Sequence, residues 1–200
     1  MTHTAIVHLG AGNTASVLFA LERLGADARI TADPVEIAEA ERLVLPGVGA
    51  AGYAMEQMAA LGLTDIIKGF ERPLLGLCLG QQLLFAESEE NGGASMLGFI
   101  PGRVTRMPVR DDLPVPHMGW SQLHNLEDDP LLQGVVEGDY AYFVHSYVCP
   151  DTDATIACAD YGAEVPAMVR TGNRWGCQFH PERSAKAGAR ILKNFLELPA

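Results

Sequence analysis

Residues 73–85 read Pro-Leu-Leu-Gly-Leu-Cys-Leu-Gly-Gln-Gln-Leu-Leu-Phe. The first half is a short, continuous apolar run, which is typical of a strand buried on both faces of a parallel sheet. The second half places leucines at helical spacing. Cys78 lies at the junction, and Gly76 and Gly80 flank it at a distance of two residues. The stretch therefore predicts a strand, a sharp turn and a helix.

This layout predicts a nucleophile elbow, with cysteine in the place where a hydrolase carries serine. Small residues on both sides of Cys78 let the chain turn sharply from strand into helix. The turn would hold the sulfur at a helix N-terminus, where the dipole and the free N–H groups favour a thiolate. A buried core cysteine is the alternative, because free cysteine is among the most buried residue types.

The composition is that of one folded domain covering residues 1–200. Apolar residues make up 48% and charged residues 20% of the chain, which argues against disorder. The formal net charge of −11 argues against nucleic acid as a partner. No basic segment precedes an apolar run at the N-terminus, and no stretch approaches the length of a membrane span. We therefore expect a soluble, cytoplasmic protein that does not contact a membrane.

Neither the cysteines nor the glycines indicate a bound cofactor. The cysteines are Cys78, Cys149, Cys158 and Cys177. They lack the spacing of metal ligands and the setting of a small disulfide scaffold, so we expect thiols, three of them packed in the core. Gly10 and Gly12 match a dinucleotide fingerprint only in part, and a tight strand-to-helix turn is the preferred interpretation. We expect no metal and no organic cofactor.

Strands alternate with helices over the first 86 residues, which predicts an α/β fold with a doubly wound, mostly parallel sheet flanked by helices. The strands expected before the elbow are 4–9, 27–31 and 42–45. The second half changes character, because strand-like pieces follow one another and short turns separate several of them. These pieces, expected to be largely antiparallel and to extend or flank the sheet, are 103–107, 140–144, 154–159, 165–170 and 174–178. An amphipathic helix at 185–198 closes the chain.

A glycine-rich loop is expected after the third strand. Residues 46–52 read Pro-Gly-Val-Gly-Ala-Ala-Gly. Glycines this dense, just after a buried strand, indicate a backbone that needs unusual dihedral angles or a close approach to another group.

A base for Cys78 is found in residues 176–182, Gly-Cys-Gln-Phe-His-Pro-Glu. Pro181 pushes His180 into an extended conformation, which favours a ring at the end of the preceding strand. Glu182 is near enough to hold one ring nitrogen and to set its tautomer. Cys78, His180 and Glu182 therefore predict a nucleophile–base–orienter triad. A surface histidine beside a solvated glutamate is the alternative.

Together, the two motifs resemble those of the class I (triad) glutamine amidotransferases, and the resemblance runs the length of the chain. Further segments resemble one branch of that family, the glutaminase subunits of imidazole glycerol phosphate synthase. These segments are Pro-Gly-Val-Gly at 46–49, Glu-Ser-Glu-Glu at 87–90, Pro-His-Met-Gly-Trp at 116–120 and Tyr-Phe-Val-His-Ser-Tyr at 142–147.

The resemblance implies a flavodoxin-like amidotransferase fold and hydrolysis of glutamine to glutamate and ammonia. The Cys78 thiolate would attack the side-chain amide carbon, and His180, oriented by Glu182, would protonate the departing ammonia. Backbone N–H groups of Gly49 and Leu79 are the expected oxyanion hole.

The resemblance also implies four residues that bind the substrate. Gln82 and Glu90 would grip the amino-acid end of glutamine, with Ser146 and Tyr147 beside it. No metal takes part.

A partner is implied as well, a (β/α)8-barrel cyclase that forms a heterodimer with this chain. It would use the ammonia to make imidazole glycerol phosphate and aminoimidazole carboxamide ribotide in histidine biosynthesis. Four residues depart from the family pattern: His8-Leu9 is found where the family has Asp-Tyr, Ser121 where it has Asn, and Arg183 where it has Lys. None is in the triad, and Arg183 lies where the family contacts its cyclase, so the departures bear on the interface.

Two other functions are compatible with the residues. One is another enzyme on the same scaffold, such as a glutaminase of pyridoxal phosphate synthesis or a gamma-glutamyl peptidase; the segments 116–120 and 142–147 argue against it. The other is a non-catalytic regulatory or scaffolding subunit, which the intact triad argues against. We interpret His117 and Trp120 as core residues, and His145 as a strand histidine with a structural partner rather than a second base.

Overall fold

The computed structural model describes residues 3–10, 12–109 and 113–199, so Ala11 in the predicted glycine turn lies outside the described part. Its centre is a nine-stranded sheet with the order β2-β1-β3-β4-β13-β12-β11-β8-β9. The strands are β1 (Thr4–Val7), β2 (Ala28–Thr31), β3 (Arg42–Gly47), β4 (Leu74–Cys78), β8 (His117–His124), β9 (Tyr140–His145), β11 (Thr155–Asp160), β12 (Glu164–Thr171) and β13 (Arg174–Cys177).

The sheet has a parallel half and an antiparallel half. Strands β2, β1, β3, β4 and β13 run parallel to one another. Strands β12, β11, β8 and β9 continue the sheet with antiparallel pairing. The predicted division is confirmed, with one refinement: β13 comes from the C-terminal part of the chain but pairs in parallel with β4. β4 is buried along its whole length, as its continuous apolar run predicts.

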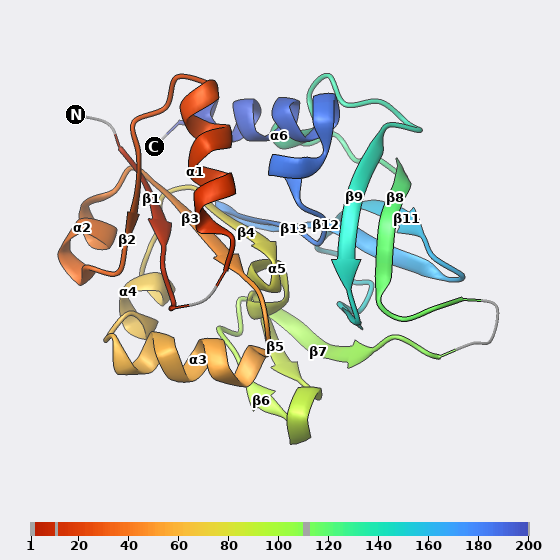
Figure 1. Cartoon of the computed structure of the whole chain (residues 1–200), viewed down its shortest axis with the longest axis horizontal. Coiled ribbons are helices and arrows are strands. Elements are labelled where there is room, and N and C mark those ends of the chain that lie inside the picture. The colour runs from red at the N-terminus through yellow and green to blue at the C-terminus, as the bar shows by residue number, and fades with distance from the viewer. Residues whose placement is uncertain (1–2, 11, 110–112, 200) are drawn as a thin grey trace.

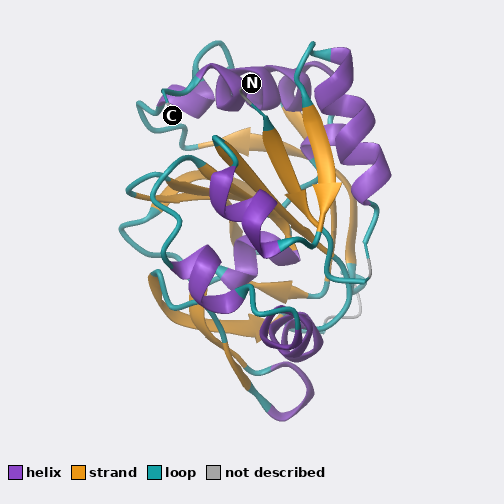
Figure 2. Cartoon of the chain, turned by 90° about the vertical axis from the view of Figure 1, so that its left-hand side faces the viewer, coloured by secondary structure: helices purple, strands orange, loops and turns teal. Residues whose placement is uncertain are grey.

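Helices cover both faces of the sheet (Figure 1). The helices are α1 (Thr14–Arg23), α2 (Pro34–Glu39), α3 (Ala51–Ala60), α4 (Thr64–Lys68), α5 (Leu79–Leu83) and α6 (Ala185–Glu197). α1 and α6 lie on one face, where Leu21 and Phe195 enter the same apolar cluster. α2 to α5 lie on the other face, where Ile37, Met58 and Leu83 enter a second cluster. Figure 2 shows these layers from the side.

A second, four-stranded sheet packs beside the α3–α5 face, with the order β10-β7-β5-β6. Its strands are β5 (Phe85–Ser88), β6 (Ala94–Ser95), β7 (Ile100–Arg106) and β10 (Tyr147–Val148). Short 3-10 turns are η1 (Glu90–Gly92), η2 (Pro130–Leu132) and η3 (Pro181–Arg183). Sequence analysis predicted β7 in part and did not predict β5, β6 or β10, because two- to four-residue strands leave almost no periodic signal.

Two local predictions are corrected. The loop expected over residues 46–52 is shorter, because β3 runs through Gly47 and α3 begins at Ala51. Trp120, expected in the core, is 51% exposed, whereas His117 is buried as expected. Both lie on β8, whose side chains alternate between the two faces.

Among the described residues, no helix is long and apolar enough to span a membrane.

Candidate active site

Cys78 occupies the predicted elbow between β4 and α5. Its backbone has φ 55° and ψ −108°, a region that non-glycine residues rarely adopt and that marks functional turns. The turn is tight, because a Cβ atom on Gly80 would lie 1.8 Å from the carbonyl oxygen of Leu45. A side chain at that position would collide with β3. The elbow therefore depends on glycine, as the sequence pattern predicts.

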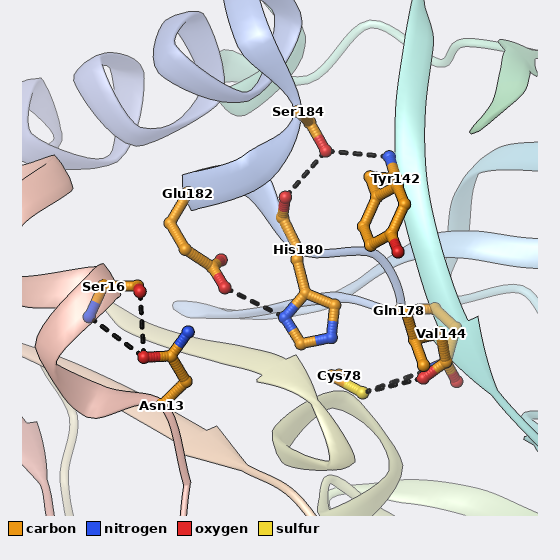
Figure 3. Close-up of polar contacts among 9 residues, drawn as sticks. All are labelled: Asn13, Ser16, Cys78, Tyr142, Val144, Gln178, His180, Glu182 and Ser184. Carbon is orange, nitrogen blue, oxygen red and sulfur yellow. Dashed lines mark hydrogen bonds and ion pairs between the residues drawn. The ribbon is translucent and has the colours of Figure 1, made fainter. Parts of the chain in front are cut away.

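His180 follows β13 and is fixed through its backbone. Its N–H donates to the carbonyl of Tyr142 at 2.9 Å, and its own carbonyl accepts from the Ser184 hydroxyl at 2.7 Å. The Ser184 oxygen in turn accepts from the Tyr142 N–H at 2.9 Å (Figure 3). The backbone of His180 is thus tied to β9 on one side and to the start of α6 on the other.

The carboxylate of Glu182 orients the imidazole. His180 Nδ1 lies 2.9 Å from Glu182 Oε1, and the Glu182 side chain is only 2% exposed. Figure 3 shows the ring between this carboxylate and the sulfur of Cys78. Because β13 pairs in parallel with β4, with Cys177 opposite Leu77, the ends of both strands meet at one edge of the sheet.

The His180 imidazolium is strongly favoured. Burial by itself lowers the pKa of His180, but hydrogen bonds to Cys78 and Glu182 and the charges of both raise it to about 10. A proton that leaves the sulfur therefore has a stable position on the ring. This is the arrangement that a cysteine nucleophile with a histidine base requires.

A cavity of about 340 Å³ opens beside the sulfur, within the usual size of small-ligand sites. Every site residue predicted from the sequence lines it except Glu182, which lies behind His180. The predicted residues in its wall are Gly49, Cys78, Leu79, Gln82, Glu90, Ser146, Tyr147 and His180.

The two residues expected to grip the substrate are already held by the protein. Glu90 Oε2 accepts a hydrogen bond from the N–H of Ala51 at 2.8 Å, at the start of α3. Gln82 Nε2 donates to the carbonyl of Tyr147 at 3.2 Å and to Gln178 Oε1 at 3.0 Å. These contacts fix both side chains at the cavity wall.

Gln178 was not singled out from the sequence. It is fully buried, and its Nε2 donates to the sulfur of Cys78 at 3.9 Å. The carbonyl of Val144 lies 3.7 Å from the same sulfur. Gln178 precedes His180 by two residues in an extended segment, so a polar side chain among apolar neighbours was the available signal.

His145 has structural partners, as predicted. Its Nδ1 lies 2.8 Å from the Tyr147 carbonyl, and its Nε2 lies 3.0 Å from Nδ1 of His117. Nε2 of His117 contacts the hydroxyl of Ser121 at 2.9 Å. Burial, with the neighbouring histidines, lowers the pKa of His117 to about 3 and that of His145 to about 4, although the hydrogen bond to Tyr147 raises the latter. Both rings are neutral at pH 7.

The family model for glutamine amidotransferase class-I matches residues 5–198. The chain belongs to the class I glutamine amidotransferases. Two close relatives carry the name imidazole glycerol phosphate synthase subunit HisH. The one from Xanthomonas axonopodis pv. citri is 49% identical over 99% of this amidotransferase and 98% of the relative. The one from Xylella fastidiosa strain Temecula1 is 48% identical over the full length of both.

The predicted identification of this amidotransferase as the glutaminase subunit of imidazole glycerol phosphate synthase, in histidine biosynthesis, is therefore confirmed. A solved structure described as a glutamine amidotransferase aligns with a TM-score of 0.74 and 21% identity, covering 97% of each chain. At that identity the likeness concerns the fold alone, and it confirms the predicted amidotransferase fold. Among the described residues, no group of histidine, cysteine and carboxylate side chains could hold a metal ion.

Proposed function

We propose that Cys78, His180 and Glu182 form the catalytic triad that hydrolyses glutamine to glutamate and ammonia. The observation that carries the proposal is the chain of contacts from the Glu182 carboxylate through the imidazole to a sulfur held at a strained elbow. The cavity beside that sulfur leaves room for a small amide substrate.

The reaction begins with the Cys78 proton already on His180, and the thiolate attacks the amide carbon of glutamine. The resulting oxyanion accepts hydrogen bonds from the N–H groups of Leu79 and Gly49. Leu79 is the first residue of α5, so its N–H has no partner within the helix. Gly49 has a φ of +88°, a conformation that orients its peptide as other residues would resist.

His180 then gives its proton to the departing ammonia, and a thioester remains on Cys78. Water, activated by the now neutral ring, attacks the thioester and releases glutamate. Throughout, Glu182 keeps the imidazole orientation and stabilises the charged form.

The amino-acid end of glutamine lies along Gln82, Glu90, Ser146 and Tyr147. A carboxylate at Glu90 offers a counter-charge to the substrate's ammonium group, and its hydrogen bond from Ala51 keeps it in place. The amino-acid end is thus held from two sides, by residues of α5 and η1 on one side and by the β9–β10 segment on the other.

A (β/α)8-barrel cyclase is the proposed partner, in a heterodimer that turns the ammonia into imidazole glycerol phosphate and aminoimidazole carboxamide ribotide. Met118 and Trp120 are 62% and 51% exposed on β8, and Trp120 packs edge-on against Tyr142. The Arg183 guanidinium lies 4.9 Å from the centre of the same Tyr142 ring. This apolar surface beside the site supports docking of the barrel. Residues 1–200 act as one glutaminase domain in the cytoplasm.

The test measures ammonia release from glutamine by this chain alone, with the cyclase, and with the cyclase plus its nucleotide substrate. We expect release to rise with each addition and to vanish when Cys78→Ala replaces the wild-type chain. Ammonia release that survives in Cys78→Ala would contradict the triad. Equal rates in all three mixtures would contradict coupling to the cyclase.

A further inference from the structure

One backbone carbonyl fixes the direction of the hydrogen bonds around the site. The Tyr147 oxygen accepts from Gln82 Nε2 at 3.2 Å and contacts His145 Nδ1 at 2.8 Å. A carbonyl oxygen can only accept, so both side chains must present N–H groups to it. The Tyr147 carbonyl thereby sets the donor and acceptor roles in two chains of hydrogen bonds, a first branch through Gln82 and a second branch through His145.

The first branch leads to the nucleophile. Gln82 uses the same Nε2 to reach Gln178 at 3.0 Å, so Gln178 must offer its oxygen there. The amide nitrogen of Gln178 is thereby directed at the sulfur of Cys78, 3.9 Å away. Gln82 is 5% exposed and Gln178 fully buried, so the hydrogen bond between them is largely shielded from bulk water.

The second branch holds the Tyr147 carbonyl in place. His145 donates through Nδ1, so in the neutral ring Nε2 accepts from Nδ1 of His117. Nε2 of His117 then accepts from the Ser121 hydroxyl. The His117 ring is stacked between two aromatic rings, Phe143 at 4.7 Å and Tyr161 at 4.0 Å between centres. The anchor is therefore rigid.

We propose that Gln178 is a catalytic residue that donates an N–H hydrogen bond to the Cys78 thiolate, and that Gln82 is the positioning residue that orients it. This inference rests on the proposed function for its role in turnover. The Val144 carbonyl can accept the thiol proton but repels a thiolate. When the proton moves from the sulfur to His180, the Gln178 N–H compensates for the contact that Val144 loses.

The experiment measures alkylation of Cys78 by iodoacetamide, which needs no turnover and no partner. Gln178→Met keeps the approximate size and removes the donor, and Gln82→Met removes the residue that orients it. Gln122→Met, at an exposed position on β8, is the matched control. Burial raises the pKa of the Cys149 thiol to about 12, and the Cys158 pKa, raised by burial and nearby carboxylates, is about 11. Cys177 is fully buried, which raises the pKa of its thiol still further, so alkylation at neutral pH reports on Cys78.

We expect Gln178→Met to react about tenfold more slowly at pH 7, which is close to the lower end of the range for loss of a hydrogen bond to a charged group. Gln82→Met should be slowed about threefold and Gln122→Met not at all. The deficits should shrink as the pH rises, which a general loosening of the structure would not produce. Wild-type reactivity in both Gln178→Met and Gln82→Met would overturn the proposal.

A second measurement does not depend on a Gln178 variant that folds. In 15N-labelled protein, Cys78→Ala should shift the side-chain amide resonances of Gln178 and leave those of Gln122 unchanged; unchanged Gln178 resonances would overturn the contact. The wild-type chain could also release no ammonia with the cyclase while Gln178→Met is still alkylated more slowly. That result would support the hydrogen bond to Cys78 and contradict the proposed glutaminase function.

Discussion

Gly76 and Gly80 lie so close across the elbow that a Cβ atom on Gly76 would be 2.4 Å from the carbonyl oxygen of Gly80. β4 and α5 therefore pack backbone against backbone on the two sides of Cys78. This contact lets the sulfur project at the end of the strand instead of continuing along the sheet. The two glycines thus shape the site although neither lines the cavity.

Gly80→Ala is expected to lower the free energy of unfolding by about 3 kcal/mol or more, because the new methyl group collides with the Leu45 carbonyl and cannot move away. Gly52→Ala is the matched control: it lies in α3, where an added Cβ would be 3.7 Å from Ala94, so stability should be unchanged or slightly raised. Urea unfolding followed by circular dichroism measures both. Equal stabilities would show that the elbow can relax.

Cys78→Ala is expected to abolish glutamine-dependent synthesis by the complex with the cyclase, because the remaining groups have nothing to activate. Synthesis from added ammonium salts should survive, since that step is assigned to the proposed cyclase partner and not to this chain. The matched comparison is Cys158→Ala, at a buried thiol away from the cavity. Loss of the ammonium-dependent reaction would point to misfolding or failed assembly.

Glu182→Gln should lose less glutaminase activity than His180→Ala. Glu182→Gln leaves the thiol and the imidazole in place, whereas His180→Ala eliminates both proton transfers. Steady-state kinetics of ammonia release in the complex compare the two. If Glu182→Gln matches the wild type, the carboxylate has no orienting role.

Acid should destabilise the chain through the buried histidine pair. The folded-state pKa values, about 3 for His117 and about 4 for His145, lie below the unfolded value of about 6.5. Their contribution is therefore complete above pH 6.5 and is lost as the pH falls, at most about 2 kcal/mol for each ring by pH 5. The contribution of His180 to stability depends on pH in the opposite direction. Its raised pKa stabilises the fold below pH 6.5 and loses that effect towards pH 10.

Urea midpoints at pH 7 and pH 5 provide the measurement. His117→Gln should be less stable than wild type at pH 7 because the stacked ring is lost, yet its stability should fall less between the two pH values. A fall as steep as that of the wild type would mean that the buried pair does not set the acid response.

The parallel half of the sheet and the elbow could be predicted because their residues carry strong local signals. One such signal is Asp33-Pro34, because an aspartate followed by a proline is typical of a helix start; at the start of α2, Asp33 accepts from the N–H groups of Val35 and Glu36. β8 was missed because its sequence, with His117, Gly119 and Ser121, lacks the apolar alternation by which strands are detected. Its identity as a strand depends on pairing with β9 and β11.

Residues of the candidate site could be predicted from the sequence where they form a short motif, and could not where their position depends on packing. Cys78 and His180 belong to short sequence motifs whose spacing has a known chemical reason. Gln178 contacts the sulfur of Cys78, 100 residues away in the chain, and Ser121 contacts the buried His117 ring on its own strand, so only the folded chain shows these contacts. Gln82 was predicted as a contact to substrate, and its hydrogen bonds to Tyr147 and Gln178 became visible only in the structure.

The position of β13 between β4 and β12 has a consequence for biosynthesis of the protein itself. The nucleophile and its base are about a hundred residues apart in the chain, so at ordinary translation rates Cys78 leaves the ribosome about 5 to 20 s before His180 does. During that interval the neighbouring place in the sheet is empty and the sulfur has no base. A nascent or prematurely terminated chain is therefore unable to hydrolyse glutamine. The strand that completes the centre of the sheet also brings His180 and Glu182 to the site.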